Sequence, residues 1–185
     1  MGKSHDLATL SDDGISTLKV DTIKSTGGTT AMTVDSSGRV LRSVLPAFRV
    51  GLTSQQTSTS AGLKKVEFDT TSSKNCFLQG GVTSSTGTIT VPVAGLYNVG
   101  ATIRIDAVTG SNYIIAYIRK NQADNPLEGT YVIVDDHGTN YHTLTVNDLF
   151  QCQAGDELEC YVYVQSDSSW NLAAERSLFN GHLVG

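Results

Sequence analysis

The sequence predicts an all-β protein with two regions, an N-terminal arm over residues 1–46 and a larger β-sandwich head over residues 47–185. Charged residues make up only 17% of the chain, below the ~25% typical of soluble domains, and Thr, Ser and Gly take their place. Those residues suit strands and tight turns. Long stretches rich in Ala, Leu, Glu and Lys at helical spacing are missing, so strands are expected to build the fold.

The arm is polar and contains no Phe, Tyr or Trp. It carries short alternating pieces over residues 18–23, 32–34 and 40–41. Each piece is too short to close a core of its own, because a strand needs partners on its edge and on its apolar face. We therefore expect the arm to pair with other chains or to lie on a larger surface. A disordered tail is the alternative that its polarity leaves open.

The head opens near Phe48, the first aromatic residue of the chain. Alternating segments with turn signals between them then recur to the C-terminus. Strands are expected over residues 65–68, 88–93, 96–105, 113–120, 130–134, 142–150, 158–164 and 177–184. Short strands at this spacing predict a sandwich or jelly roll, with at most one helical turn over residues 172–176.

Two of the expected strands carry apolar or aromatic side chains on both faces. Tyr113 and Tyr117 share one face of their strand, and Tyr161 and Tyr163 share one face of theirs. A strand in a monomeric sandwich needs only one apolar face. Tyr is enriched in buried contact patches, so these four tyrosines are predicted to form a trimer interface. The alternative is that they are ordinary surface residues of a pleated sheet.

Composition argues against several classes of function. The net charge of −5 and the pI near 5.2 are opposite to what binding to nucleic acid requires. The basic pairs Lys64-Lys65 and Arg119-Lys120 are interpreted as strand-edge charges. No apolar run approaches the ~20 residues of a membrane span, and no hydrophobic segment of a signal peptide is expected. Cys76, Cys152 and Cys160 have no metal-ligand spacing and are expected to be reduced thiols of a protein made in a cytoplasm.

No catalytic residue and no cofactor are predicted. The chain has no Gly-x-Ser-x-Gly elbow and no phosphate-binding motif. The adjacent carboxylates Asp156 and Glu157 diverge on a strand and are expected to be turn groups. No metal site is predicted either. His137 and His142 lie near acidic residues without a strong ligand spacing, and an acidic surface loop explains them.

The candidate ligand-binding loops contain Trp170 and His137. Trp170 follows Ser168-Ser169 in an expected loop, where its ring could be presented to a ligand such as a sugar. An amphipathic plug at the end of the sandwich is the alternative for this residue.

Four stretches, taken in order, resemble a known family. They are residues 86–99 with Pro92 and Gly95-Leu96-Tyr97, residues 118–121, residues 149–158 with Gly155-Asp156, and residues 177–184 with Phe179, Gly181 and Leu183. Together they resemble the globular head of complement C1q, within the tumour-necrosis-factor-like superfamily. The resemblance implies a jelly roll that works as a homotrimer. Gln122 stands where the family has Gly, which leaves the turn type open. Some heads of this family bind calcium, which makes Asp135 and Asp136 weak candidates for such a site.

The arm has a resemblance of its own. Residues 20–40, and above all 35–40, are similar to segments of bacteriophage tail-fibre and virion-appendage proteins. The two resemblances imply a structural protein assembled in the host cytoplasm and displayed on the virion surface: a tail fibre, a head fibre or a capsid decoration protein. Its partners would be other virion proteins of capsid or tail, and its head could bind a host surface glycan. A polysaccharide-cleaving tail spike and a secreted cytokine-like ligand are the alternatives.

Overall fold

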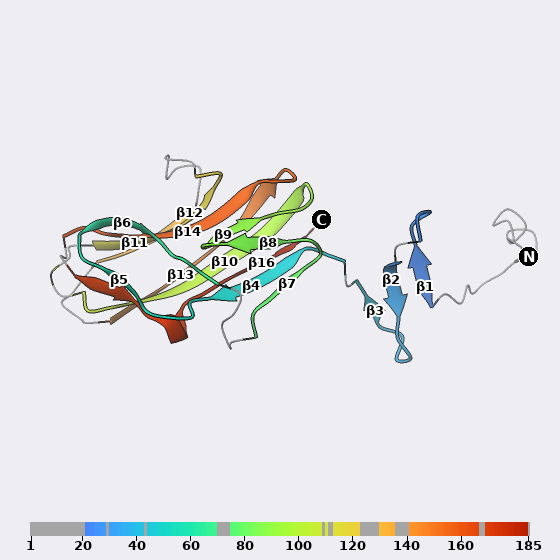
Figure 1. Ribbon diagram of the computed structural model, residues 1–185, viewed down its shortest axis with the longest axis horizontal. Coiled ribbons are helices and arrows are strands. Elements are labelled where there is room, and N and C mark those ends of the chain that lie inside the picture. The colour runs from blue at the N-terminus through green and yellow to red at the C-terminus, as the bar shows by residue number, and fades with distance from the viewer. Residues whose placement is uncertain are drawn as a thin grey trace, which may run out of the picture. The chain divides into compact units, whose positions relative to one another are not determined.

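The computed structural model describes residues 21–28, 30–42, 44–69, 75–108, 110, 113–122, 130–135, 141–166 and 169–184 (Figure 1). The chain divides into two compact units, residues 1–44 and 45–185. The sequence places the boundary between residues 46 and 47, close to this division. The two units are called the arm and the head below, and each is described by itself.

The arm forms a small antiparallel sheet in the order β1-β2-β3, with the strands β1 (Thr22–Lys24), β2 (Thr30–Val34) and β3 (Val40–Leu41). Ile23 pairs with Met32, so their side chains share a face of the sheet. The turn between β2 and β3 is held by Asp35, whose Oδ1 accepts hydrogen bonds from the backbone N–H groups of Ser37 (2.9 Å) and Arg39 (3.0 Å). The alternating pieces thus pair with one another through local turns.

The head contains two antiparallel sheets. Sheet B contains the strands β4 (Ala47–Gly51), β5 (Gln56–Ser58), β7 (Phe77–Gln79), β10 (Gly95–Asp106), β13 (Tyr141–Cys152), β15 (Trp170–Leu172) and β16 (Leu178–Leu183). Sheet C contains β6 (Gly62–Lys65), β8 (Thr83–Ser85), β9 (Thr88–Thr90), β11 (Tyr113–Lys120), β12 (Thr130–Asp135) and β14 (Glu157–Val164). A 3-10 turn, η3 (Ala174–Arg176), falls in the segment where one helical turn is expected. The prediction of an all-β fold is confirmed.

Sheet B has the order β5-β15-β10-β16-β4-β7, and β13 pairs with the other edge of β10. Sheet C has the order β12-β11-β14-β9-β8, and β6 pairs with β14 next to β9. Figure 1 shows the two sheets as two layers of the head. The strands β10 and β14 lie inside their sheets, because each pairs with other strands along both of its edges.

The core lies between the two sheets. Strand β10 alternates between half-buried and buried positions over most of its length, as expected for a strand with one face inward. The ring of Phe179 meets Phe48 edge-on at 5.1 Å and stacks on Phe68 at 5.6 Å. Cys152 and Cys160 are buried in this core and Cys76 is half-buried, and all three thiols are free. Burial raises the pKa of both core thiols.

Most of the expected strands lie within a few residues of their predicted positions, and one is displaced. The strand expected over residues 65–68 ends at Lys65 in the ladder. Val66 and Phe68 instead turn fully into the core. Trp170 belongs to the short strand β15 rather than to a loop, because its pairing with Ser58 draws it into sheet B.

Candidate functional site

The outer face of sheet C, the face turned away from the core, brings together a set of aromatic and aliphatic side chains. Tyr117 lies opposite Tyr161 in the β11–β14 ladder and opposite Tyr131 in the β11–β12 ladder. Side chains directly opposite each other in a ladder lie on one face. The same registers complete what we call the tyrosine face: Leu63, Tyr113, Ile115, Tyr117, Tyr131, Ile133, Tyr161 and Tyr163.

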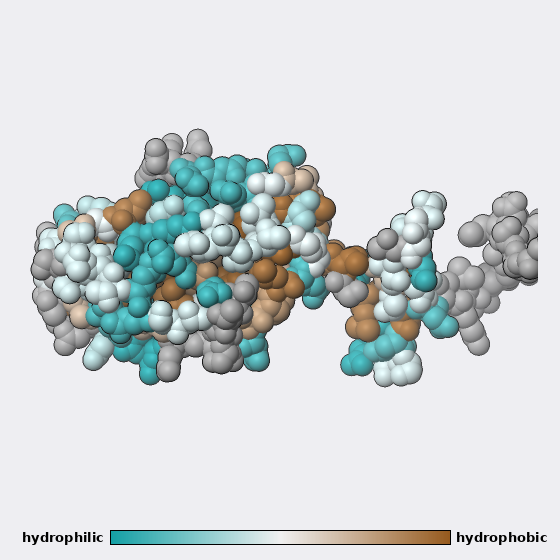
Figure 2. All heavy atoms as spheres, viewed as in Figure 1, coloured by the Kyte–Doolittle hydropathy of each residue, from teal (hydrophilic) through white to brown (hydrophobic). Residues whose placement is uncertain are grey.

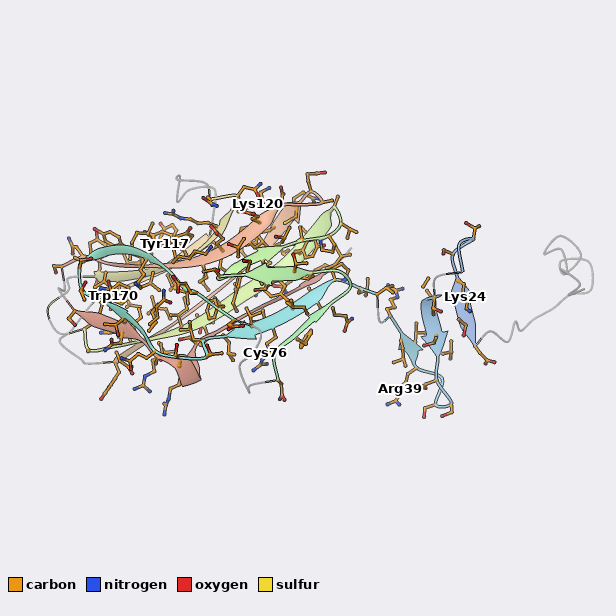
Figure 3. All side chains as sticks on the ribbon, in the orientation of Figure 1. Lys24, Arg39, Cys76, Tyr117, Lys120 and Trp170 are labelled. Carbon is orange, nitrogen blue, oxygen red and sulfur yellow. The ribbon has the colours of Figure 1, made fainter. Side chains whose placement is uncertain are left out.

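The rings of the tyrosine face pack on one another. Tyr113 and Tyr163 stack with centroids 5.9 Å apart, and Tyr117 meets Tyr131 at 6.0 Å. Tyr117, labelled in Figure 3, is only 9% exposed, and burial raises its pKa. At the margin Tyr131 is 51% exposed and Ile133 is 50% exposed. The face is therefore buried around Tyr117 and exposed to solvent at its margin.

A buried carboxylate lies beside these rings. Glu159 of β14 is 1% exposed. Its Oε1 receives hydrogen bonds from Lys65 Nζ (2.5 Å) and Thr88 Oγ1 (2.7 Å), and its Oε2 receives one from the Tyr161 hydroxyl (2.9 Å). Burial acts to raise the pKa of Glu159, but the three hydrogen bonds outweigh it and hold the pKa below the usual 4.5. The carboxylate is thus ionised near neutral pH, and both of its oxygens accept hydrogen bonds within the head.

Arg119 stands directly opposite Glu159 in the β11–β14 ladder. Its guanidinium carbon lies 4.9 Å from the ring centroid of Tyr161 and 5.4 Å from that of Tyr117, so the cation sits against two aromatic faces. Arg119 is 9% exposed, and its Nε has no hydrogen-bond partner. Arg119, interpreted from the sequence as a strand-edge charge, is instead largely buried against these two rings.

The structure brings the four tyrosines of the predicted trimer interface, Tyr113, Tyr117, Tyr161 and Tyr163, onto one face. That this face contacts another subunit stays a prediction. Sequence reasoning missed the other members of the site. For Tyr131 and Ile133 a signal existed, since they alternate within residues 130–134. For Arg119 and Glu159 there was none, because their pairing depends on the β11–β14 register.

The candidate ligand-binding role of Trp170 is wrong for this structure. Its side chain is fully buried, and its Nε1–H donates a hydrogen bond of 3.0 Å to the carbonyl oxygen of Ser60. The ring therefore cannot be offered to a ligand, and the alternative of a plug near the end of the sandwich fits (Figure 3). His137, the other residue of the candidate loops, lies outside the described residues.

Only one of the two weak calcium candidates is among the described residues. Asp135 ends β12 and is exposed, whereas Asp136 lies outside the described residues. His142 lies half-buried in β13. Within the residues that the structure describes, no group of three or more His, Cys, Asp or Glu side chains could hold a metal ion.

A polar hollow of about 290 Å³ crosses the outer face of sheet B. Its floor is Gly100, where a side chain would press against Asn147, since an added Cβ would lie 3.1 Å from Asn147 Oδ1. Ala101 and Val146 also line it, and its polar side chains are amides, hydroxyls and an imidazole: Asn98, Thr102, Thr145, Asn147, Asn180 and His182. Such groups can bind a ligand by hydrogen bonding.

In the part of the chain that the structure describes, no helix is both long enough and apolar enough to cross a lipid bilayer. Compared with known proteins, the chain matches no protein-family model and no curated protein.

Proposed function

We propose that this chain is a non-enzymatic structural protein of a bacteriophage virion. It works as a homotrimer, with jelly-roll heads that project outward and arms that attach to the capsid or tail. The tyrosine face is the single observation that carries the trimer. Sheet C already buries its inner face in the core, so a second apolar face has no role within one head. Threefold association would cover it with neighbouring copies.

The strand order supports the jelly roll. The chain passes from β9 in sheet C to β10 in sheet B, and then to β11 and β12 in sheet C. It returns to sheet B for β13, to sheet C for β14, and to sheet B for β16. Interleaving of two antiparallel sheets in this way is typical of double-sheet jelly rolls.

The arm supports attachment to a larger assembly. Its sheet leaves Ile23, Val40 and Leu41 exposed by 47%, 55% and 49%. Figure 2 shows such brown, apolar atoms at the surface of the arm. A sheet this small buries too little apolar surface to be stable alone, so a protein surface on the particle would supply the missing contact.

The assignment as a non-enzymatic protein rests on how the candidate groups are used. Asp156 accepts hydrogen bonds from the backbone N–H of Gln153 (2.8 Å) and from Asn121 Nδ2 (2.9 Å), so it works as a turn residue. If the head also binds a host glycan, the polar hollow over Gly100 is the better candidate than Trp170, because its amides and hydroxyls are accessible.

Sedimentation equilibrium of the purified protein tests the oligomer. The wild type is expected at three times 19.7 kDa. Tyr161→Glu with Tyr163→Glu places two charges in the tyrosine face and should give monomers. The matched control is Thr143→Glu with Thr145→Glu, the same spacing at exposed positions of β13 in sheet B.

Each result has a distinct meaning. A monomeric wild type contradicts the autonomous trimer. If only the control variant dissociates the trimer, the interface lies on sheet B, and the prediction that the tyrosine face forms it is wrong. Antibody labelling of purified particles then tests the virion assignment, which fails if the protein is absent from them.

A further inference from the structure

We infer that Arg119 binds a carboxylate supplied by a neighbouring copy of this chain, at the end of the tyrosine face next to Tyr117 and Tyr161. The inference rests on the proposed trimer and adds to it the charged contact that fixes the pairing. It starts from the one cation of this face that the described structure leaves without an anion.

The charges of the site do not balance within one head. Lys65, which is half-buried, and Arg119 are both cations, whereas the buried Glu159 is the carboxylate beside them. Both oxygens of Glu159 are already bonded, by Lys65, Thr88 and Tyr161. Arg119 takes part in no described hydrogen bond or ion pair, and its Nε is buried without a partner. A buried cation without a counter-charge is costly, so the site is complete only when an anion is added.

The site is ready to receive that anion. The rings of Tyr117 and Tyr161 hold the guanidinium in place, so little side-chain freedom is lost when it is bound. The planar guanidinium matches a carboxylate in two parallel hydrogen bonds. Arg and Tyr are also among the residue types that contribute most to the binding energy of protein–protein interfaces.

A second copy of the chain is the occupant that fits. Sheet C offers a face spread over several strands, which suits another protein surface. The chain carries 18 acidic against 13 basic residues, so each copy has carboxylates in excess. In the head, Glu67, Asp135 and Asp148 are exposed. The unpaired cation of one copy and the excess carboxylates of the next are complementary.

The experiment compares Arg119→Met with Arg104→Met. Arg104 is a matched control, because it also lies over a tyrosine ring (Tyr141, 4.6 Å) but already has its carboxylate, Asp106 at 2.6 Å. Sedimentation equilibrium over a range of protein concentrations gives the association constant at low and high salt. Arg119→Met is expected to weaken association by about tenfold or more and to reduce its salt dependence. Arg104→Met is expected to associate like the wild type.

Several results overturn the inference. One is an Arg119→Met variant that associates as tightly as the wild type. If that variant is also absent from purified particles, Arg119 instead contacts a different virion protein. Another is wild-type association that does not weaken as salt rises, a readout that needs no variant. Circular dichroism confirms that Arg119→Met is folded, and Arg119→Lys, which keeps the charge, should lose less affinity. A wild type that is monomeric at every concentration contradicts the proposed trimer itself.

Discussion

Arg119 and Glu159 face each other in the β11–β14 ladder, yet the ion pair of Glu159 is made with Lys65 of β6. Lys65 therefore ties β6 to β14 through a buried carboxylate, while Arg119 is left to the aromatic rings beside it. Position in a ladder makes a charge pair available but does not decide which donor takes the carboxylate. Here the extra hydrogen bonds from Thr88 and Tyr161 favour the arrangement around Lys65.

The buried carboxylate predicts a dependence of stability on pH. The pKa of Glu159 is held below its ordinary 4.5, so the unfolded chain binds a proton there more readily than the folded one. This contribution is present above pH 4.5 and is lost as the pH falls through the lower, folded pKa. Glu159→Gln should cost about 1–3 kcal/mol of unfolding free energy near neutral pH and less in acid. Urea titrations at several pH values measure this, with the exposed Glu67→Gln as control. A loss that is equal at every pH contradicts the prediction.

The burial of Trp170 predicts its spectroscopic behaviour. It is the only tryptophan of the chain, so its fluorescence reports one site. Native emission should be blue-shifted and resistant to acrylamide quenching, and both properties should be lost on unfolding. Trp170→Ala should destabilise the head by about 3–5 kcal/mol, because it leaves a large cavity and removes the hydrogen bond from the indole to the Ser60 carbonyl. Readily quenched emission from the native protein would mean that Trp170 is exposed to solvent and would contradict the prediction.

The turn after β11 predicts opposite effects for two neighbouring residues. Asn121 and Gln122 both have positive φ, 54° and 53°. The side chain of Asn121 stabilises this turn through two hydrogen bonds. Its Nδ2 donates to Asp156 Oδ1 (2.9 Å), and its Oδ1 accepts from the backbone N–H of Glu157 (2.8 Å). Gln122→Gly relieves a conformation that side chains disfavour and should stabilise the head by about 1 kcal/mol. Asn121→Gly should destabilise it. Thermal unfolding of the two variants distinguishes them, and equal shifts would contradict this account.

The glycine of β16 predicts a packing defect. A Cβ at Gly181 would lie 2.6 Å from Cε1 of the buried Phe48 ring and 3.0 Å from the backbone oxygen of Asn98. Gly181→Ala should therefore cost about 1–3 kcal/mol by overpacking. Gly100→Ala is the control, since its nearest neighbour is the side chain of Asn147, which can move. Denaturant unfolding that ranks Gly100→Ala as the worse variant would contradict the prediction.

Alternating hydrophobicity predicted the long strands of the head well, because each has one face in a common core. β11, for instance, occupies the very residues expected for it, Tyr113–Lys120. The short strands β5, β7, β8 and β15 were not predicted, since three residues are too few to show a period. Trp170 was misplaced for the same reason. Its neighbours are polar, and the partner that buries it, Ser58, is far away in the sequence.

The candidate site was predicted in part. The tyrosines of β11 and β14 could be found because two apolar faces on one strand are visible in a single segment. That they share a face with Tyr131 and Ile133 depends on the pairing of β11 with β12. The bonding of Glu159 by Lys65 likewise depends on the neighbourhood of β6 and β14, which no local pattern encodes.

The two apolar faces of β11 and β14 also bear on how these strands find their alignment during folding. A strand with one apolar face resists a slip of one residue, because the slip would turn that face to water. β11 and β14 lack this safeguard, since a slipped strand would still present Ile or Tyr to the core. Arg119 and Glu159 restore it: the same slip would turn an ionised side chain inward, away from the groups that now surround it. The charges of the outer face thereby select one register for the centre of the sheet.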